Sequence, residues 1–470
     1  MSSQREDAIV IGAGPAGLAA GYELVKQGVK PLVLEKSSAV GGMARTEACD
    51  GYRFDVGPHR FFTKDPEVQK IWEDVLGDNF IRVPRLTRIF YGGKFYDYPL
   101  NIAGTLRNLG VLESAGIVLS FIRWRLFPYP TEETFDRWVT NRFGKRLFET
   151  FFKVYTEKVW GTPCHEIQAE WAAQRIQGLS LAAILRNALS KKTTSKSLIK
   201  QFHYPRLGAG ALYEAMAKEI EDGGGIVAKD SPVEAVHVED NAVVGVTTNA
   251  ARIATETLVS SMPLSELIAK IRPPAPEDIR SAAATLRYRD ILIVYLFVST
   301  PDLFPDNWIY VHSPEVMVSR ISNYRNWSAA MAPSESNACL GMEYFCNEGD
   351  EIWNKSDEHL LSLAKAEIAR LGLVRSSRID GGAVIRQAKA YPVYDGDYKT
   401  SVEKIAAYIS SVSGLQTIGR NGLHRYNNMD HSMLTGLYAA RNINGGKFDV
   451  WSANTEQEYH EEISKDPAKK

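Results

Sequence analysis

The spacing of hydrophobic and polar positions near the N-terminus predicts a strand, a helix and a second strand. Positions 8–11 form a short unbroken apolar run, which is typical of a buried parallel strand. Positions 18–27 carry a helical pattern, and positions 31–34 form a second apolar run. This order of elements within so short a stretch predicts a βαβ unit.

Three glycines between the first strand and the helix give this unit a binding function. Gly12, Gly14 and Gly17 have G-x-G-x-x-G spacing. Gly12 allows a tight turn, Gly14 lets the backbone approach a pyrophosphate, and Gly17 lets the helix pack closely on the strand. Glu35 ends the second strand, where a carboxylate can accept hydrogen bonds from ribose hydroxyls. The stretch therefore predicts a dinucleotide site, with the phosphates at the helix N-terminus.

Beyond this unit the pattern alternates between helical and strand-like stretches. A helix is predicted at 67–76 and a hairpin at 88–96, and the region 99–200 is mainly helical, with one run at 135–152. The later predictions are a helix at 211–222, strands at 226–228, 231–248, 258–262, 291–298, 308–311, 317–319 and 339–345, and a helix at 357–371.

Composition narrows the classes of protein that fit. The chain has 470 residues, 44% of them hydrophobic, and a formal net charge of −1, so it lacks the basic excess of a dedicated nucleic-acid binder. Its four cysteines are widely spaced and do not form a zinc pattern, which favours reduced thiols and no metal site. Together with an N-terminus that lacks a signal-peptide core, this predicts a cytoplasmic protein.

One apolar stretch leaves two alternatives open. No run reaches the roughly 18 uncharged apolar residues that span a membrane. The segment Ala115–Phe127 mixes apolar residues with Arg123 and Arg125, which fits a helix lying on a membrane surface. A partly buried helix in a helical region is the favoured alternative.

The polar, basic stretch 189–201 also leaves two alternatives open. It is either a solvated loop or a loop that closes over an anionic ligand.

The residues after Glu35 indicate which dinucleotide binds, because they resemble the motifs of a known family. The paired glycines Gly41 and Gly42, followed by Arg45, and the segment 51–59 (GYRFDVGPH) resemble glutathione-reductase-type FAD proteins, in the branch of amine oxidases, protoporphyrinogen oxidases and UDP-galactopyranose mutases. The resemblance implies FAD and an α/β fold, in which a Rossmann domain carries an inserted helical region and an antiparallel β-sheet substrate domain. It implies this division: 1–98, FAD-binding, first part; 99–202, helical substrate or lid region; 203–275, FAD-binding, second part; 276–409, substrate sheet; 410–450, FAD-binding, C-terminal part; 451–470, polar tail.

Three further motifs, in the same order along the chain, look like those of UDP-galactopyranose mutases. They are the segments 151–161 (FFKVYTEKVWG), 319–324 (SRISNY) and 419–430 (GRNGLHRYNNMD). The resemblance implies a flavin-dependent sugar-nucleotide mutase that interconverts pyranose and furanose forms. In such an enzyme N5 of reduced FAD attacks the anomeric carbon, with NAD(P)H one candidate reductant. The implied partner is a nucleoside-diphosphate sugar, and a homodimer is one candidate assembly.

The resemblance also assigns residues to roles. The implied catalytic group is His59, Arg320 and Arg420, around flavin N5 as the nucleophile. The implied substrate-binding residues are Tyr155, Trp160, Arg175, Arg320, Tyr344 and Tyr426. The implied cofactor-binding residues are Gly12, Gly14, Pro15, Ala16, Gly17, Glu35, Lys36, Gly42, Met43, Arg45, His59, Val233, Arg420, Asn428 and Met429. Arginine suits a diphosphate because its planar fork binds phosphate oxygens in pairs, and tyrosine adds neutral donors.

Three positions depart from the mutase motifs. Phe62 stands where the family's G-P-H-x-F-H motif has its second histidine, His424 replaces a tyrosine, and Asn428 replaces an aspartate. These positions surround the flavin and the sugar in the family. They keep open an alternative function, an FAD-dependent oxidoreductase of the amine oxidase or protoporphyrinogen oxidase type. A third, weaker alternative is a protein that keeps FAD only as a structural group.

Overall fold

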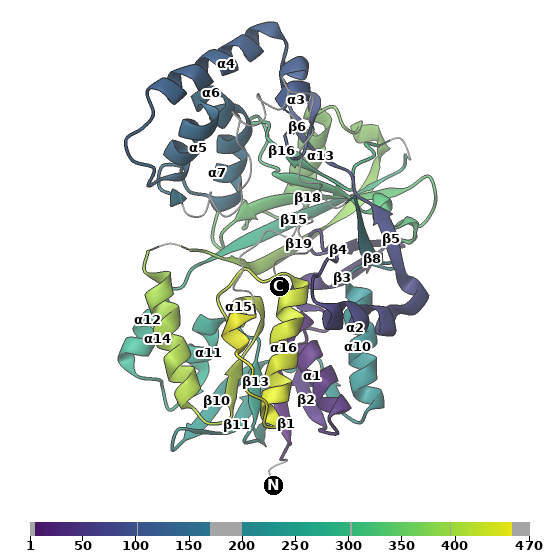
Figure 1. The fold of residues 1–470 in the computed structure, drawn as a ribbon. Helices are drawn as coiled ribbons and strands as arrows, with labels where there is room; N and C mark the ends of the chain where they lie inside the picture. Colours follow the sequence, from purple (N-terminus) through teal and green to yellow (C-terminus); the bar gives the residue numbers. More distant parts are fainter. Residues whose placement is uncertain (1–4, 101, 170–199, 301–302, 395, 454–470) are drawn as a thin grey trace.

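A five-stranded parallel sheet carries the N-terminal βαβ unit, which lies in the lower part of Figure 1. The computed structural model describes residues 5–100, 102–169, 200–300, 303–394 and 396–453. The strand order is β20 (Leu415–Thr417), β13 (Leu258–Ser260), β1 (Ala8–Ile11), β2 (Pro31–Leu34) and β9 (Ile226–Ala228). Strands from distant parts of the sequence thus complete the sheet that begins with β1 and β2.

The two faces of this sheet bury two separate cores, because side chains alternate along each strand. Val10 belongs to the core with helices α1 (Pro15–Lys26), α2 (Pro66–Leu76), α10 (Gly210–Asp222) and α16 (Met429–Ile443). Ile9 belongs to the opposite core. That core includes a four-stranded sheet and three helices: β12 (Arg252–Ala254), β11 (Ala242–Thr248), β10 (Val233–Glu239), β14 (Ile271–Arg272), α11 (Leu264–Lys270), α12 (Glu277–Ala284) and α14 (Tyr398–Ser411).

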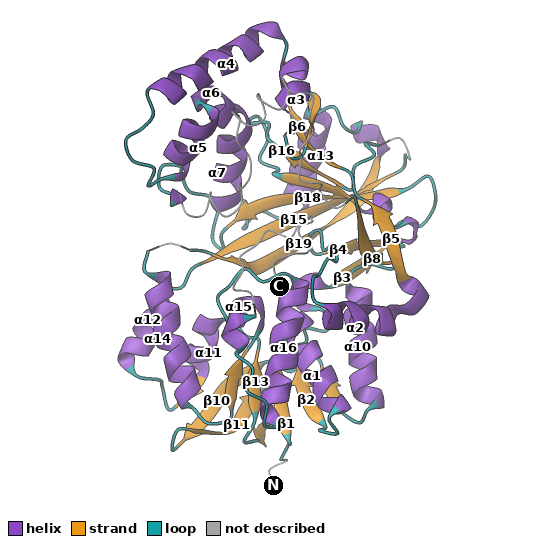
Figure 2. Cartoon of the chain, viewed as in Figure 1, coloured by secondary structure: helices purple, strands orange, loops and turns teal. Residues whose placement is uncertain are grey.

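A seven-stranded sheet lies above the nucleotide-binding layer (Figures 1 and 2). Its order is β19 (Ile379–Pro392), β15 (Tyr288–Val298), β18 (Ala338–Cys346), β17 (Arg320–Asn323), β16 (Trp308–Val311), β6 (Thr87–Tyr91) and β7 (Lys94–Asp97). All neighbours are antiparallel except β16 and β6. Helix α13 (Asp357–Arg370) packs on one face, so the register of each strand decides which side chains turn away from that helix.

The helical region forms the upper left part of Figure 1. It contains α3 (Ile102–Leu109), α4 (Val111–Leu126), α5 (Phe135–Phe143), α6 (Lys145–Phe148), a π-helical turn (Glu149–Lys153) and α7 (Val154–Trp160). The single helix predicted at 135–152 is wrong, because Gly144 interrupts it with a φ of 81°. A side chain at Gly144 would lie 2.8 Å from the backbone of Phe121, so this glycine also lets α4 approach.

Short elements connect these layers. The ribbon β5 (Phe80–Pro84) with β8 (Gln201–Pro205) joins the chain on either side of the helical region. The others are β3 (Thr46–Cys49), β4 (Tyr52–Asp55), α15 (Gly419–Gly422) and the 3-10 turns Gly42–Ala44, Gly77–Asn79, Tyr324–Asn326, Ala329–Met331, Ser376–Arg378 and Val450–Ser452. None of the described helices is long and apolar enough to cross a membrane.

The architecture confirms the predicted fold class, and it corrects one further local prediction besides the helix at 135–152. No strand forms at 317–319, and β17 begins instead at Arg320. The long strand β19 and helix α14 were not predicted. The domain boundaries stay predictions.

Candidate cofactor and substrate site

The turn from β1 to α1 has the geometry that its glycines predict. Gly12 has a φ of 93°, and its N–H donates to the Leu34 carbonyl over 2.8 Å. A Cβ on Gly17 would lie 1.8 Å from the Gly12 carbonyl oxygen, so helix and turn touch through bare backbone. Helix α1 begins at Pro15, and no side chain caps its N-terminus. Its first N–H groups, at Ala16 and Gly17, therefore remain for an anion.

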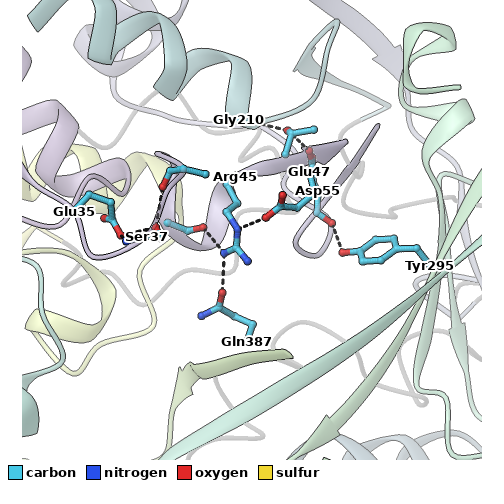
Figure 3. Close-up of polar contacts among 11 residues, drawn as sticks. Glu35, Ser37, Arg45, Glu47, Asp55, Gly210, Tyr295 and Gln387 are labelled. Atoms are coloured by element: carbon cyan, nitrogen blue, oxygen red, sulfur yellow. Dashed lines mark hydrogen bonds and ion pairs between the residues drawn. The ribbon is translucent and has the colours of Figure 1, made fainter. Parts of the chain in front are cut away.

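Glu35 lies at the end of β2, 6% exposed, with its carboxylate tied to the glycine turn. One oxygen accepts from the Ala13 N–H at 2.7 Å, and the other accepts from the Ser37 hydroxyl at 2.6 Å and from the Ser37 N–H at 2.9 Å (Figure 3). These bonds fix the carboxylate beside the turn, where a ribose would lie. The next residue, Lys36, is exposed.

The loop after β2 closes over the start of α1. A Cβ on Gly42 would lie 3.1 Å from the Gly14 Cα, so the two backbones nearly touch. Arg45 donates to the Gly42 carbonyl at 3.0 Å, to Glu47 at 2.6 Å and to the Gln387 side-chain oxygen of β19 at 2.9 Å (Figure 3). Arg45 thus joins the cofactor loop to the upper sheet.

Val233 begins β10 and is buried on the opposite face of the parallel sheet. Its carbonyl accepts a hydrogen bond from the Lys270 ammonium at 2.8 Å. Nearby, the Ser231 N–H donates to the Glu35 carbonyl at 2.8 Å, which places this segment beside the ribose end of the predicted dinucleotide.

A cavity of about 450 Å³ lies where the upper sheet meets the start of α16. Seven of the predicted site residues line it: Met43, His59, Arg320, Arg420, Tyr426, Asn428 and Met429. The other described residues in its wall are Val56, Gly57, Pro58, Arg60, Phe61, Phe62, Ile291, Trp308, Tyr310, Trp327, Gln387, Ala390, Tyr391, Tyr394, Tyr398, Lys399, Val402, Glu403, Leu423, His424, Arg425, Asp430 and His431. The structure therefore brings together segments that are up to 388 positions apart, from 43 to 431.

His59 is neutral in this wall. Burial, reinforced by the charge of Arg420, lowers its pKa to about 3. Its Nδ1 lies 3.0 Å from the Gly57 carbonyl, which can only accept a hydrogen bond, so Nδ1 carries the proton. At neutral pH Nε2 is therefore a hydrogen-bond acceptor, and the His59 ring carries no positive charge.

Arg320 is paired with a buried carboxylate. It stands opposite Glu343 in the β17–β18 register, and its Nε donates to Glu343 at 2.7 Å, with a second bond from Nη2. Arg320 is 15% exposed and lines the cavity, whereas Glu343 is 1% exposed and lies buried behind it. Burial raises the pKa of Glu343, and Arg320 opposes that shift. Nη1 of Arg320 has no hydrogen-bond partner in the described part of the chain and remains for a ligand.

Two tyrosines and a second arginine form the neighbouring wall. The rings of Tyr391 and Tyr426 stack with centroids 5.7 Å apart. The Arg420 guanidinium lies 4.7 Å from the Tyr426 centroid, and its Nε and Nη1 donate to the carbonyls of Asn427 and Ala390 at 2.8 and 3.1 Å. Burial raises the pKa of Tyr391 to about 12, so its hydroxyl stays a neutral donor.

The start of α16 faces the same cavity. Asn428 is the N-cap residue, yet its side chain makes no capping hydrogen bond, and Met429 is the first helical residue. The backbone N–H groups of the first turn can therefore meet a polar ring edge or an anion.

Tyr155, which is predicted to stack on the nucleotide base, lies beside the cavity. The Tyr155 ring stacks on His312, with centroids 5.0 Å apart, and lies 5.4 Å from the ring of Tyr310, a wall residue. Trp160 is the last residue of α7, five positions on. Arg175 and most of the stretch 189–201 lie outside the described residues.

The structure does not bring Tyr344 to the site. It follows Glu343 in β18, so its side chain emerges on the opposite face of the sheet. There it packs in the core beneath α13, and its hydroxyl donates to Glu367 at 3.1 Å. The prediction chose the correct segment but the wrong residue, because the strand alternation turns Glu343 towards Arg320 and Tyr344 to the opposite face.

Sequence reasoning missed several wall residues. Tyr391 is the clearest, because its hydroxyl and ring lie beside Arg420 and Arg320. The signal was present in the alternation of 384–391 (VIRQAKAY), which is typical of a strand with one polar face. Arg60 follows His59 at the variable position of the G-P-H-x-F-H motif and lines the cavity, but it was not among the predicted site residues.

These features fit a bound dinucleotide. The uncapped start of α1 and the side-chain-free backbones at Gly14 and Gly42 suit a pyrophosphate, and Glu35 suits a ribose. The cavity beside Arg420 and the start of α16 is separated from that end, as a ring system at the far end of the dinucleotide requires.

Comparison with curated proteins gives partial matches. A 1-hydroxycarotenoid 3,4-desaturase of Flavobacterium sp. (strain P99-3) is 35% identical over 99 residues, which are 20% of this chain and 20% of that protein. A probable UDP-galactopyranose mutase of Klebsiella pneumoniae is 25% identical over 167 residues, 34% of this chain and 42% of that protein. The chain spans less than half the length of these curated relatives.

Solved structures match over nearly the whole chain. A crystal structure of reduced UDP-galactopyranose mutase has a TM-score of 0.84 at 19% identity and covers 97% of this chain and 100% of that one. A putative protoporphyrinogen oxidase from Exiguobacterium sp. 255-15 has a TM-score of 0.69 at 17% identity and covers 95% and 99%. At these identities the matches show the fold alone, and they confirm the FAD-binding fold class.

The family comparison covers part of the site. Residues 15–376 match the family described as flavin containing amine oxidoreductase, which includes α1, Glu35, His59 and Arg320. The match extends over more than half of the chain and confirms the prediction of a flavin cofactor. The protein therefore belongs to the flavin-containing amine oxidoreductase family, with FAD as its cofactor.

Proposed function

We propose that this flavoprotein is a sugar-nucleotide mutase that interconverts pyranose and furanose forms, like UDP-galactopyranose mutase. The observation that carries the proposal is the charge of the cavity wall. It contains five permanent cations, Arg60, Arg320, Lys399, Arg420 and Arg425, against two carboxylates, Glu403 and Asp430. Such a wall favours an anionic substrate, as a nucleoside-diphosphate sugar is, and disfavours a cationic amine.

Different residues of the site bind different parts of the proposed substrate. Arg320 offers Nη1 to a diphosphate oxygen while Glu343 holds its other edge, so the guanidinium enters the complex already oriented. Tyr391 and Tyr426 add neutral hydroxyl donors from one wall. Tyr155 provides an aromatic face for the base, and Trp160 and Arg175 are further proposed contacts.

The chemistry needs little acid or base catalysis from side chains. When bound and reduced, FAD supplies a nucleophilic N5 for the anomeric carbon. Neutral His59 accepts a hydrogen bond at Nε2 and adds no charge beside the ring system, while Arg420 stabilises negative charge there. Arg320 and its carboxylate partner Glu343 are largely buried, so this side of the cavity is shielded from bulk water.

A second candidate function is an FAD-dependent oxidoreductase of the amine oxidase or protoporphyrinogen oxidase type. One observation favours it: Glu343 neutralises Arg320, which lowers the positive charge available for a diphosphate. The remaining excess of cations still favours an anionic substrate, such as a porphyrinogen carboxylate, over an amine.

Activity of the dithionite-reduced protein tests the proposal. We expect isomerisation of UDP-galactofuranose, or of another nucleotide furanose, by the reduced protein and none by the oxidised protein. Bleaching of oxidised FAD by an amine or a porphyrinogen, with no isomerisation of any nucleotide sugar, would establish the second function instead.

Binding of UDP to the FAD-loaded protein tests the role of Arg320. Because Arg320→Ala alone strands the Glu343 carboxylate, the informative variant is Arg320→Met with Glu343→Gln, which removes both charges together. We expect UDP affinity to fall about tenfold, as for the loss of one charge-assisted bond. Arg325→Ala is the matched control, since Arg325 bonds loop carbonyls near Ser334.

A further inference from the structure

Exposed apolar side chains concentrate on one helix of the chain. Among the described residues, eleven large hydrophobic side chains are exposed, and six of them lie within α4 and the residue after it. They are Val111 (86% exposed), Leu112 (91%), Leu119 (67%), Ile122 (47%), Leu126 (67%) and Phe127 (74%). These side chains form the solvent-facing surface of the segment for which the sequence left a membrane-surface helix and a partly buried helix open; α4 is partly buried through Ile117 and leaves this surface exposed.

The exposed residues form a stripe, which we call the α4 stripe: Val111, Leu112, Ala115, Leu119, Ile122 and Leu126. At 3.6 residues per turn these positions fall within about 100° of the helix circumference. The stripe is centred opposite Ile117, which is 2% exposed and packs into the protein. Helix α4 is therefore amphipathic, with its apolar side turned outward.

Basic residues border the α4 stripe. On the same helical projection Arg123 and Arg125 lie on its two sides, and both are exposed. Arg107 of α3 borders the other end, beside an apolar groove lined by Leu106, Val118 and Leu119. These three arginines have no ion-pair partner within the described ranges, whereas Glu113, the acidic residue of α4, is bonded by Arg146 over 2.7 and 2.8 Å.

We propose that the α4 stripe docks on an anionic lipid surface, with α4 lying in the plane of the membrane interface. An outward apolar stripe with basic residues along both borders suits acyl chains in the middle and phosphate headgroups at the sides.

The position of α4 permits this contact. In Figure 1 the helix runs along the outer edge of the helical region, away from the nucleotide-binding sheet. A second copy of the chain fits the stripe less well. A two-fold interface would bring this face against itself, and its unpaired charges are all positive.

Flotation of the full-length FAD-loaded protein with vesicles tests the proposal. We expect binding to vesicles of phosphatidylcholine with phosphatidylglycerol, weaker binding to phosphatidylcholine alone, and release by salt. The variant Leu119→Ser with Ile122→Ser should abolish binding, and Arg123→Gln with Arg125→Gln should weaken it about fivefold for each arginine. Ile226→Ser is the matched control, because Ile226 is 50% exposed on β9, which belongs to the five-stranded sheet and not to the helical region.

Unchanged FAD absorbance and circular dichroism would show that the variants fold. Absence of binding to both kinds of vesicle would overturn the proposal, as would equal binding by the wild type and the Leu119→Ser, Ile122→Ser variant. A dimer by sedimentation that the same variant dissociates, without vesicle binding, would assign the α4 stripe to a second copy.

Discussion

The two ends of the predicted FAD site are built in different ways. At the glycine turn, backbone meets backbone: the Gly12 N–H bonds the Leu34 carbonyl, and Gly17 packs on Gly12 without side chains. At the cavity, side chains from separate strands meet, as Arg320 of β17 and Glu343 of β18 do. The glycine turn therefore depends on positions without side chains, which let backbones touch. The cavity depends on charge pairing and on strand register.

The largest expected effect comes from adding one methyl group at the glycine turn. In Gly17→Ala the Cβ would lie 1.8 Å from the Gly12 carbonyl oxygen, so α1 must shift away from β1. We expect a loss on the order of 5 kcal/mol or failure to fold. Thermal unfolding and flavin absorbance per mole of protein measure this.

Gly14→Ala separates binding of the cofactor from folding at the same turn. The nearest atom to its Cβ is the Gly42 Cα at 3.8 Å, so the folded protein accommodates the methyl group with a change of about 0.5 kcal/mol or less. The methyl group would occupy the space of a pyrophosphate, and we expect FAD affinity to fall at least about tenfold. Full FAD affinity in this variant would contradict the backbone cradle.

The second effect tests charge pairing at the cavity. Glu343→Leu leaves the Arg320 guanidinium, 15% exposed, without its carboxylate, and we expect a loss of about 3–5 kcal/mol in urea unfolding. Adding Arg320→Met should recover most of that loss, because neither charge then remains buried. A loss below about 1 kcal/mol for Glu343→Leu would mean that water reaches the pair.

The same contrast explains which parts of the site the sequence could predict. The glycine turn is formed by residues within one short stretch, so spacing alone located Gly12, Gly17 and Glu35. The cavity depends on the register of β18 and β19, and a shift of one residue moves a side chain to the other face. That is why Tyr344 was chosen although its neighbour Glu343 is the residue that pairs with Arg320, and why Tyr391 was missed together with the rest of its strand.

The fold divides in the same way. Strands β1, β2, β9 and β13 of the parallel sheet were predictable because they are short apolar runs, whereas β20, which contains Gln416 and Thr417, was not predicted. The helix at 135–152 was predicted without its break, because the approach of Phe121 to Gly144 is a tertiary contact that periodicity does not contain.

The third effect concerns Asp55, which lies between the two ends and is fully buried. Burial raises its pKa from 3.8 to about 7, and hydrogen bonds from Tyr204 at 2.5 Å, Thr46 at 2.6 Å and the Ala209 N–H at 3.0 Å oppose the shift. The folded protein keeps the proton that the unfolded chain loses near pH 4. The contribution of Asp55 to stability is therefore complete below about pH 4 and is lost as the pH rises to about 7.

Asp55→Asn should flatten this dependence. We expect the free energy of unfolding of the wild type, relative to the variant, to fall by roughly 2–4 kcal/mol between pH 4 and 7. Urea unfolding at a series of pH values measures it. Parallel pH profiles in the two proteins would show that Asp55 is ionised in the folded state.

The smallest effect compares two tyrosines that the sheet directs to different places. Tyr344→Phe removes the 3.1 Å bond to Glu367 beneath α13, so it should cost about 1 kcal/mol of stability and leave UDP affinity unchanged. Tyr391→Phe removes a hydroxyl that has no hydrogen-bond partner in the described part of the chain, so stability should hold while UDP binds about fivefold more weakly. Thermal unfolding and UDP titration of both variants measure these two effects. If Tyr344→Phe weakened UDP binding and Tyr391→Phe lowered stability instead, Tyr344 would contact the ligand and the opposite face of the sheet would bind it.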